Sequence, residues 1–323
     1  MKKSKLKIKT KGKEYGIKDS PFYNLRTKHH LAVLLNCSNS DLKKYAKDVG
    51  NYHEFEEKGA NQKVRKIQQP MRGLDKVHTR IASLLCRITT PDYLHSGKKK
   101  HSNVSNALAH TEGENSRTPL MTTDVKSFFP STSKKMIFSF FYSVMKCSAD
   151  VSDILADICT VHHFLPTGSR ISMPLAFWAN SRMFSELEQL SKKHDIFMTV
   201  YVDDLTFSGV NVNPLFKTTV KKILNRYGHI MHPDKTKVYD CDDAKLVTGV
   251  IIKGGTIMVR NEQRKQLVND LSCWSVIKNQ PNAINNTFTQ RLIGRLHSMG
   301  VVDETFKKRA MTIRNQTNRT PIS

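Results

Sequence analysis

The apolar residues of the chain recur at two spacings, one typical of helices and one typical of strands. From about residue 22 they predict two short helices, the second beginning near Ser40. Residues 52–70 are expected to form a hairpin that turns near residues 59–61, with residues 64–67 as its return strand. From Leu74 to Ile88 the apolar positions follow helical spacing again. The first part of the chain is therefore predicted to combine helices with one hairpin.

Downstream, strand patterns alternate with helix patterns. The predicted elements are, in order, a polar loop over 91–118 with a short helix near Asn106, a strand in 119–129, helices in 134–160 and 172–193, strands on both sides of 201–204, a helix over 213–227, and short strands around 237–238 and 247–252. After about residue 260 the pattern is helical. The alternation over 119–252 predicts an α+β fold in which helices cover one face of a sheet.

The excess of basic residues points to the kind of partner. Among 323 residues, Lys and Arg number 52 against 28 Asp and Glu, which gives a formal net charge of +24. Such an excess indicates a polyanionic partner, either nucleic acid or an anionic membrane surface. Residues 1–14 form a lysine-rich arm, which we expect to be mobile until it meets phosphate, unless it serves only solubility.

The cysteines follow no metal-binding or disulfide pattern. They are Cys37, Cys86, Cys147, Cys159, Cys241 and Cys273. None forms a Cys-x-x-Cys pair or lies beside a histidine at zinc spacing, so we expect reduced core thiols in a cytosolic protein. The basic N-terminus lacks an apolar segment and no stretch approaches about 18 apolar residues, so we expect neither a secretion signal nor a membrane span.

Two adjacent acids, Asp203 and Asp204, lie in the middle of an apolar stretch. The segment Tyr201–Asp204 has β-branched and aromatic residues on both sides, which predicts strand, tight turn and strand. Carboxylates at a hairpin tip are hard oxygen ligands, the kind that divalent cations prefer. The pair is therefore a candidate metal site.

A third acid, Asp124, lies in the segment Thr123–Pro130, where an apolar strand is expected to give way to polar residues. A single Asp at such a place is most often a cap or turn residue. The pair at Asp203 and Asp204, however, lies far enough downstream for two helices to return the chain, so both strands can belong to one sheet. Three carboxylates on adjacent strands can hold two Mg²⁺ ions about 3.5–4 Å apart for phosphoryl transfer. Successive strand residues point to opposite faces, so Asp204 ranks behind Asp124 and Asp203. Val125 is included in the expected metal site.

These two segments together resemble the acidic motifs of reverse transcriptases. The resemblance runs from about residue 25 to about residue 300 and includes a Pro-x-Gly turn at Pro166–Gly168 and a lysine turn at His232–Thr236. It implies an α+β right-hand polymerase fold with fingers, a palm on an antiparallel sheet and a helical thumb. The expected divisions are a basic arm over 1–21, fingers over 22–118, a palm over 119–252 and a thumb over 253–323.

Two shorter motifs resemble those of bacterial retron reverse transcriptases. Asn106–His110 is similar to that group's Asn-Ala-x-x-His, and Val247, Thr248 and Gly249 match its Val-Thr-Gly triplet, which we expect to start a strand that contacts an RNA stem. The resemblance implies DNA synthesis on a structured non-coding RNA, primed from a guanosine 2′-hydroxyl to give a branched RNA–DNA product.

The same resemblance implies the other partners. They are deoxynucleoside triphosphates, two Mg²⁺ ions that Mn²⁺ could replace, and a separate effector protein in anti-phage defence. The implied place is the bacterial cytoplasm, with no membrane partner.

The resemblance also implies nucleotide-binding residues. Arg65, in an Arg-x-Ile-x-x-Pro segment, would clamp the triphosphate with its planar guanidinium, unless it is a solvated surface residue. Phe129 would exclude a ribose 2′-hydroxyl by collision, unless it is a plain core aromatic. The family usually has Gln where Thr167 stands, and residues 169–174 also depart from its pattern. Gly168 is retained, because close backbone approach requires a residue without Cβ.

Lys235 is the remaining catalytic candidate. It resembles the family's lysine that may protonate pyrophosphate as a general acid. A surface lysine in a turn is the alternative interpretation.

Four further residues are implied to bind nucleic acid. Asn106 and His110 lie one helical turn apart and would recognise RNA, or else cap and pack a loop helix. Arg291 and Arg295 share one face of a predicted helix, a spacing that would follow a phosphate backbone, or else they are simply solvated.

Two other functions remain open. One is a reverse transcriptase of the intron-maturase or diversity-generating type, although an intron enzyme would usually carry more sequence after the thumb. The other is a basic RNA-binding protein with a polymerase fold but no turnover. The acids at Asp124 and Asp203, together with Phe129, argue against the second.

Overall fold

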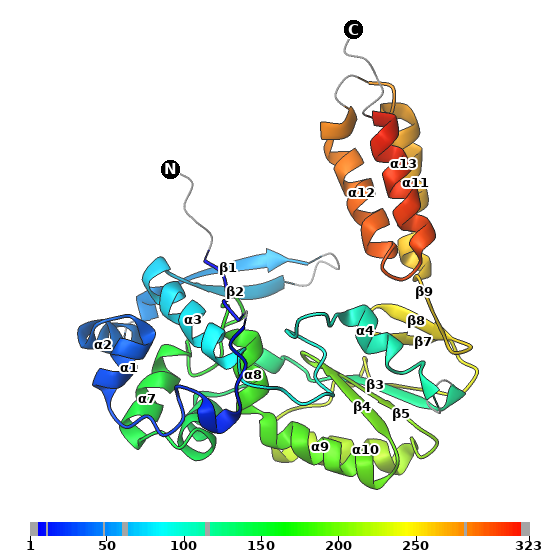
Figure 1. Cartoon of the computed structure of the whole chain (residues 1–323). Helices are drawn as coiled ribbons and strands as arrows, with labels where there is room; N and C mark the ends of the chain where they lie inside the picture. The colour runs from blue at the N-terminus through cyan, green and yellow to red at the C-terminus, as the bar shows by residue number, and fades with distance from the viewer. Residues whose placement is uncertain are drawn as a thin grey trace.

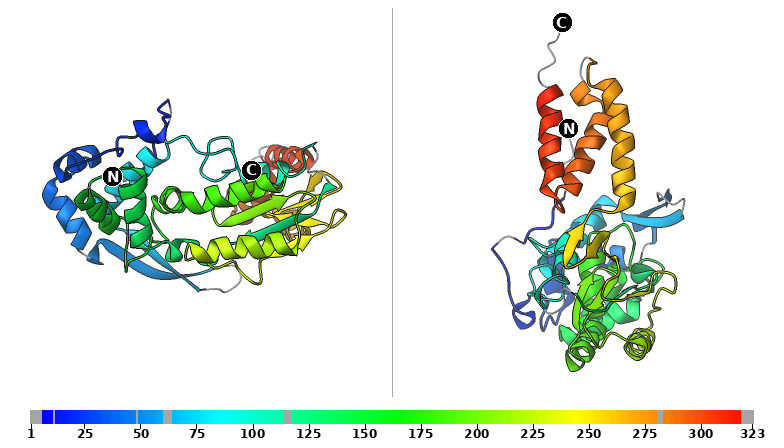
Figure 2. Two further views of the ribbon diagram at one scale, coloured as in Figure 1. Left: turned by 90° about the horizontal axis from the view of Figure 1, so that it is seen from below. Right: turned by 90° about the vertical axis from the view of Figure 1, so that its right-hand side faces the viewer.

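The C-terminal helices stand apart from the rest of the molecule. The structure, a computed structural model, describes residues 6–317 except residues 11, 48, 60–63, 114–116 and 281–282. Most of these residues form a body of helices and sheets, and the last helices rise from one side of it (Figure 1). The right-hand view of Figure 2 shows the same separation.

The first elements follow the predicted order. They are helices α1 (Lys28–Leu35) and α2 (Asn39–Lys47), strands β1 (Tyr52–Lys58) and β2 (Val64–Pro70), and helix α3 (Arg72–Leu85). Thr27 caps α1 by accepting a hydrogen bond from the His30 backbone, and Asn36 ends the helix in the left-handed conformation. The two strands form an antiparallel hairpin whose tip, residues 60–63, lies outside the described residues.

Part of the N-terminal arm is tied to α3. The Lys9 backbone N–H donates to Ser83 Oγ at 3.0 Å, and the Arg87 guanidinium donates to the Lys9 carbonyl oxygen. The mobility that we expected over 1–14 therefore does not hold at Lys9, because its backbone groups find partners there. Residues 1–5 of the arm lie outside the described residues.

The central sheet is antiparallel and has strand order β4-β5-β3-β6. Its strands are β3 (Leu120–Asp124), β4 (Phe197–Tyr201), β5 (Asp204–Ser208) and β6 (Lys237–Tyr239). Helices α9 (Ser181–Lys193) and α10 (Pro214–Arg226) cover one face (Figure 1), where the ring of Phe207 packs edge-on against that of Phe216 at 5.3 Å. The fold is thus mixed helix and antiparallel sheet, which is consistent with the predicted class.

Between β3 and β4 the chain is largely helical. Its elements are α5 (Phe128–Ser131), α6 (Lys134–Ser139), a π-helical turn (Phe140–Val144), α7 (Ala149–Ile158) and α8 (Ser172–Ala179). The prediction of one helix over 172–193 is wrong, because Asn180 separates α8 from α9. Its Nδ2 donates to the Ala176 carbonyl oxygen and to Thr132 Oγ1, and its Oδ1 accepts from His229 Nε2. Such side-chain bonds compete with the helix backbone.

A smaller sheet follows, with helix α4 (Asn103–Leu108) packed beside it. Its strands are β7 (Lys245–Val247), β8 (Val250–Lys253) and β9 (Thr256–Met258). The prediction that Val247 starts a strand is wrong: it ends β7. Thr248 and Gly249 then form a two-residue turn with φ values of 43° and 85°, as in a type I′ hairpin.

The C-terminal helices have a core of their own. They are α11 (Asn261–Ile277), α12 (Thr287–Met299) and α13 (Glu304–Thr317), as the helical pattern after residue 260 predicts. Trp274, Leu292 and Leu296 belong to a buried cluster separate from that of the body. Val302 packs against this cluster and also against the one beneath β7 and β8, so it joins the two.

Two expectations from composition have different outcomes. The cysteines are free thiols, and Cys147 and Cys159 are buried as core residues. Cys241 and Cys273 are exposed, so they are not core thiols. Within the described ranges, no helix has both the length and the apolar character needed to cross a bilayer.

Candidate active site

The predicted tight turn joins β4 to β5, with Val202 and Asp203 at its centre. Val202 has a φ of 60°, which is rare for a β-branched residue and indicates local strain. Its backbone N–H donates to Ser96 Oγ at 3.0 Å, and the Val125 backbone N–H donates to the Asp203 carbonyl oxygen at 2.9 Å. Contacts from two other segments therefore hold the strained turn.

Strand register brings the predicted acids together. Asp124 pairs directly with Asp204, and directly paired residues point to the same face of a sheet. Asp203 lies in the adjoining turn, close enough for its charge and that of Asp124 to repel each other. The alternation argument that ranked Asp204 third does not apply, because Asp203 belongs to the turn rather than to the strand.

Burial and mutual repulsion raise the pKa of two of these carboxyls. For Asp203, burial is the main cause and the charge of Asp124 adds to it. For Asp204, burial and then the charges of Asp203 and Asp124 raise the pKa to about 7. Clustered like charges that resist ionisation are typical of a functional site, and a bound cation would neutralise them.

Lys235 lies against these acids. Its Nζ donates to Asp124 Oδ1 at 2.6 Å. Burial opposes its charge, but the hydrogen bond to Asp124 and the neighbouring acids outweigh that effect and raise its pKa. The lysine side chain is 56% exposed and the Asp124 side chain 6%, so Lys235 reaches a buried carboxylate from the solvent side. This place fits the predicted proton donor.

The acids fit a metal site that a substrate completes. In the described part of the chain, no group of three or more His, Cys, Asp or Glu side chains is arranged to hold a metal ion by itself. Mg²⁺ takes few protein ligands and fills its other positions with water and substrate phosphates. The paired carboxylates of Asp124 and Asp204, beside Asp203, are hard oxygen donors of that type. Val125 contributes a backbone N–H to the turn, and its metal role stays a prediction.

Arg65 and Phe129 lie on other elements than the acids. Burial and Asp124 raise the pKa of Asp203, and Lys235 and Arg65 partly offset them, so the exposed Arg65 on β2 lies within electrostatic reach of the turn. Phe129, on α5, is only half-buried, and its ring lies 6.0 Å from that of the buried Phe128. Phe128 therefore fills the core, and Phe129 keeps part of its ring exposed.

The Pro166–Gly168 turn packs against the edge of β2. Thr167 donates its N–H to Gln68 Oε1 at 3.1 Å and its hydroxyl to the Lys66 carbonyl oxygen at 2.6 Å. A Cβ on Gly168 would lie 2.7 Å from the Gln68 carbonyl oxygen, closer than real Cβ atoms come. The absence of a Cβ at Gly168 therefore allows the turn to approach another backbone closely, and that backbone belongs to β2.

His110 holds the segment after α4 on the central sheet. Its Nδ1 lies 2.7 Å from Ser208 Oγ and its Nε2 lies 2.7 Å from Thr199 Oγ1. Burial lowers the pKa of His110 to about 3. Asn106 is also buried, and neither of its amide atoms has a hydrogen-bond partner within the described residues. The contacts of His110 suit the packing interpretation, and RNA recognition stays a prediction.

The two motifs of retron type touch each other. Asn103, at the start of α4, donates through Nδ2 to the Thr248 carbonyl oxygen at 3.0 Å, and Thr248 Oγ1 donates to the Asn103 carbonyl oxygen at 2.7 Å. Beneath them, Ala107 and Val247 belong to one buried cluster. The helix before His110 and the turn at Gly249 therefore form a single packed unit.

Arg291 and Arg295 face a neighbouring helix. Arg291 Nη2 donates to Asp270 Oδ1 at 2.9 Å and Arg295 Nε donates to Asp270 Oδ2 at 2.7 Å. The Arg291 guanidinium also lies over the Phe288 ring at 5.0 Å. The two arginines share a helix face as predicted, and their ion pairs hold α12 to α11. Phosphate binding by them stays a prediction.

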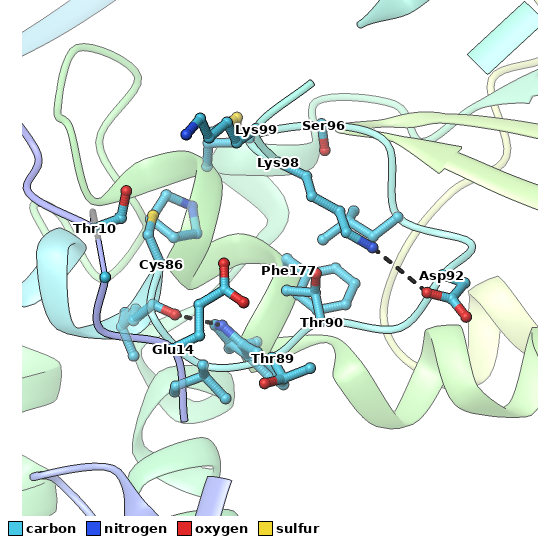
Figure 3. A pocket seen from close by; sticks show the side chains of 18 residues that line it. Thr10, Glu14, Cys86, Thr89, Thr90, Asp92, Ser96, Lys98, Lys99 and Phe177 are labelled. Atoms are coloured by element: carbon cyan, nitrogen blue, oxygen red, sulfur yellow. Dashed lines mark hydrogen bonds and ion pairs between the residues drawn. The ribbon is translucent and has the colours of Figure 1, made fainter. Parts of the chain in front are cut away.

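A pocket of about 270 Å³ lies among the N-terminal arm, the end of α3, residues 88–99 and α8 (Figure 3). Thr10 and Glu14 of the arm line it, with Cys86 from the end of α3 and Phe177 from α8. Ser96 is part of the same wall and is the residue that accepts the hydrogen bond from the turn. The wall of this pocket is thus connected to the residues that carry the acids.

Several positioning residues escaped the sequence analysis. Ser96, Gln68, Asn103 and Asp270 each fix a predicted site residue through a hydrogen bond or ion pair. Gln68 stands at an unspecified position of the Arg-x-Ile-x-x-Pro segment, and the other three lie outside the motifs. Asp270 alone had a signal in the sequence: it is an acidic residue on one predicted helix, and the helix that follows carries basic residues.

The mixed helix and antiparallel-sheet fold and the arrangement of the acids are consistent with a reverse transcriptase. Curated relatives make this more specific, because those that match are retron reverse transcriptases. Retron Se72 reverse transcriptase of Salmonella heidelberg is 29% identical over 252 residues, and retron Ec86 reverse transcriptase of Escherichia coli is 25% identical over 218 residues. Retron Ec48 reverse transcriptase of Escherichia coli is 22% identical over 248 residues. The resemblance seen in the motifs is confirmed.

These matches cover part of each relative. They span 73%, 67% and 72% of this chain, and 64%, 67% and 59% of the Se72, Ec86 and Ec48 proteins, respectively. No protein-family model matches the chain.

Proposed function

We propose that this protein is a retron reverse transcriptase, an RNA-directed DNA polymerase that uses deoxynucleoside triphosphates. The observation that carries the proposal is the meeting of Asp124, Asp203, Asp204 and Lys235 at one end of the central sheet. The similarity to retron reverse transcriptases supports it. In this proposal the β1–β2 region serves as fingers, the central sheet as palm and the C-terminal helices as thumb.

Each acid has a role in this chemistry. Asp124, Asp203 and Asp204 would hold two Mg²⁺ ions through their carboxylates. When bound, Mg²⁺ supplies charge neutralisation for the triphosphate and Lewis-acid activation of the attacking hydroxyl. Lys235 would donate a proton to the departing pyrophosphate, and its raised pKa and its hydrogen bond to Asp124 support this role.

Two residues would select and orient the nucleotide. The guanidinium of Arg65 would bind the triphosphate, for which its planar fork is suited. The half-exposed ring of Phe129 would collide with a ribose 2′-hydroxyl and so favour deoxynucleotides. Positioning and charge neutralisation dominate phosphoryl transfer, so these contacts account for much of the expected rate.

The retron resemblance extends the proposal to the template. One structured non-coding RNA would serve as template and primer, with synthesis starting at a guanosine 2′-hydroxyl and ending in a branched RNA–DNA molecule. The basic balance of the chain, +24, suits a tightly bound RNA. A separate effector and a role in defence against phage belong to the same proposal.

The test is to sequence the nucleic acid that co-purifies with the wild-type protein and with Asp203→Asn. We expect a short single-stranded DNA joined to one RNA with the wild type. With Asp203→Asn we expect the RNA alone, because synthesis falls by more than about a hundredfold when a charge-stabilising group is lost. Asp242→Asn, which changes an exposed aspartate outside the site, is the matched control and should keep the branched product.

Other outcomes would redirect the proposal. Full synthesis by Asp203→Asn would refute the metal assignment. RNA alone in every sample would favour a binding protein without turnover. Assorted unbranched cDNAs would indicate a reverse transcriptase of another type.

A further inference from the structure

The turn that carries Asp203 has a conformation that its first residue does not favour. In the two-residue loop between Tyr201 and Asp204, the φ of Val202 is positive, at 60°, and that of Asp203 is not. A positive φ at the first position alone is the pattern of a type II′ turn, in which that position usually holds glycine. A valine persists there only if neighbouring contacts hold the loop in this shape.

Ser96 supplies one of these contacts from a segment that runs beside β4. The Val200 N–H donates to the Tyr93 carbonyl oxygen at 2.8 Å, and the His95 N–H donates to the Val200 carbonyl oxygen at 2.9 Å. These bonds fix the backbone just before Ser96, whose Oγ accepts the Val202 N–H at 3.0 Å. Backbone pairing therefore sets the place of the Ser96 hydroxyl relative to the turn.

The surroundings of Ser96 limit the movement of its side chain. The residue is 7% exposed, so its hydroxyl has little solvent around it. Gly97 follows with a φ of 65°, a conformation that glycine adopts without strain. The chain thus changes direction directly after Ser96, and the contact with the turn is made by the last residue of the paired segment.

The loop is held at both ends. The Val125 N–H, from the residue that follows β3, donates to the Asp203 carbonyl oxygen at 2.9 Å. If the Ser96 bond were lost, only this second bond would remain, and Val202 could relax toward a negative φ. Such a change would rotate the peptide group next to Asp203 and move its carboxylate relative to the other two acids.

We infer that Ser96 is a positioning residue for catalysis, whose hydroxyl holds Val202 in its strained conformation and thereby keeps the Asp203 carboxylate beside the other acids. This inference rests on the proposed function. Because the hydroxyl acts on the backbone of the turn, Ser96 should affect the rate of the chemical step and not the binding of the deoxynucleotide.

The first test measures kcat and KM for dTTP on poly(rA) with an oligo(dT) primer. For Ser96→Ala we expect kcat to fall about tenfold, as for the loss of one hydrogen bond, with KM within about twofold of wild type. Ser96→Thr keeps a hydroxyl, so its kcat should stay within about threefold. Ser191→Ala is the matched control, since this buried serine bonds only to the Leu187 carbonyl oxygen of its own helix. Its kcat should stay within about twofold.

A second variant tests whether strain is the cause. Glycine adopts a φ of 60° without strain, so a loop with Val202→Gly should depend less on the Ser96 bond. In that background we expect Ser96→Ala to lower kcat by about threefold or less, against about tenfold in the wild-type background. An equal loss in both backgrounds would overturn the inference.

Amide hydrogen exchange gives a readout that needs neither metal nor substrate. In the peptide that contains Val202, Ser96→Ala should speed exchange of one amide by about tenfold, and Ser191→Ala should not. Unchanged exchange, or a fall in kcat that comes with a raised KM and a lowered melting temperature and that Ser96→Thr does not repair, would overturn the inference alone. Failure of the wild type to extend the primer, together with the absence of DNA in the co-purification, would overturn the proposed function and this role with it.

Discussion

Buried histidines dominate the residue-scale chemistry outside the site. His78, His110 and His229 are buried, and burial lowers their pKa values to about 4, about 3 and about 4, respectively. Each is neutral in the folded protein and bonded on both ring nitrogens. In the unfolded chain the same groups titrate near the ordinary value of 6.5. The unfolded state therefore binds more protons over that interval.

The sign of the resulting pH dependence follows. The three histidines leave stability intact above about pH 6.5 and reduce it progressively as the pH falls toward 4. At pH 5 we expect a loss of about 1–2 kcal/mol for each. Urea denaturation at pH 7.5 and at pH 5 measures it. His110→Gln should flatten the dependence relative to the wild type, and His163→Gln, at an exposed position, should not. Asp203 and Asp204, whose pKa values are raised, act in the opposite direction over this interval, so the variants are compared with the wild type. The same dependence in His110→Gln as in the wild type would contradict the prediction.

At the residue scale, the sequence identified the groups that carry charge but not those that hold them. Asp124, Asp203 and Lys235 could be predicted because alternating apolar strands around acids leave a recognisable pattern. Ser96 and Gln68 could not, since a single polar side chain in a loop or on an exposed strand has no periodic signature. Their partners lie far along the chain, and only the folded structure brings them together.

Between elements, the Pro166–Gly168 turn lies close against the backbone of β2. For Gly168→Ala we expect a loss of about 1–3 kcal/mol, because the added methyl group would meet backbone rather than a flexible side chain. Guanidinium denaturation measures it. The matched control is Gly294→Ala in α12, where a Cβ meets nothing within 4 Å and a helix gains about 0.5–1 kcal/mol. Equal effects of the two changes would refute the steric argument.

Element types were predictable where the apolar residues kept helical spacing over a long stretch, as in α3 and α10, and where turn residues separated two short strands, as in β1–β2. The errors fall at interruptions. Asn180 ends α8 through bonds to Thr132 and His229, which are remote in sequence. Thr248 adopts a positive φ that a threonine seldom takes. The sequence therefore predicts a strand at Val247–Gly249, where the structure has a hairpin turn at Thr248 and Gly249.

For the whole molecule, the charge of +24 predicts how RNA binding responds to salt. If about six phosphates are neutralised, affinity should fall about a thousandfold between 50 and 200 mM salt. Filter binding of the co-purified RNA over this range gives the slope. Asp203→Asn should leave the slope unchanged, because it does not remove a basic residue. A slope near zero would contradict an electrostatic mode of binding.

The sequence indicates where the C-terminal helices begin, but not how the earlier segments pack together. The separate core of α11–α13 agrees with the change to a purely helical pattern near residue 260. The limit drawn between residues 118 and 119 crosses a buried cluster, because Val104 and Ala107 pack with Val247 and Val250. The sequence could not predict this contact, because the pattern of apolar residues does not specify which other residues they will pack against.

The reciprocal bonds between Asn103 and Thr248 have a consequence for exchanging parts of the chain. Each bond joins a side chain to the backbone carbonyl oxygen of the other residue, so changing either side chain leaves the other residue's carbonyl oxygen without that partner. Each bond therefore depends on where the backbone of the other segment lies, although more than a hundred residues separate the two segments, 103–110 and 247–249, in the chain. A chimaera that takes one segment from a relative should need the other from the same source.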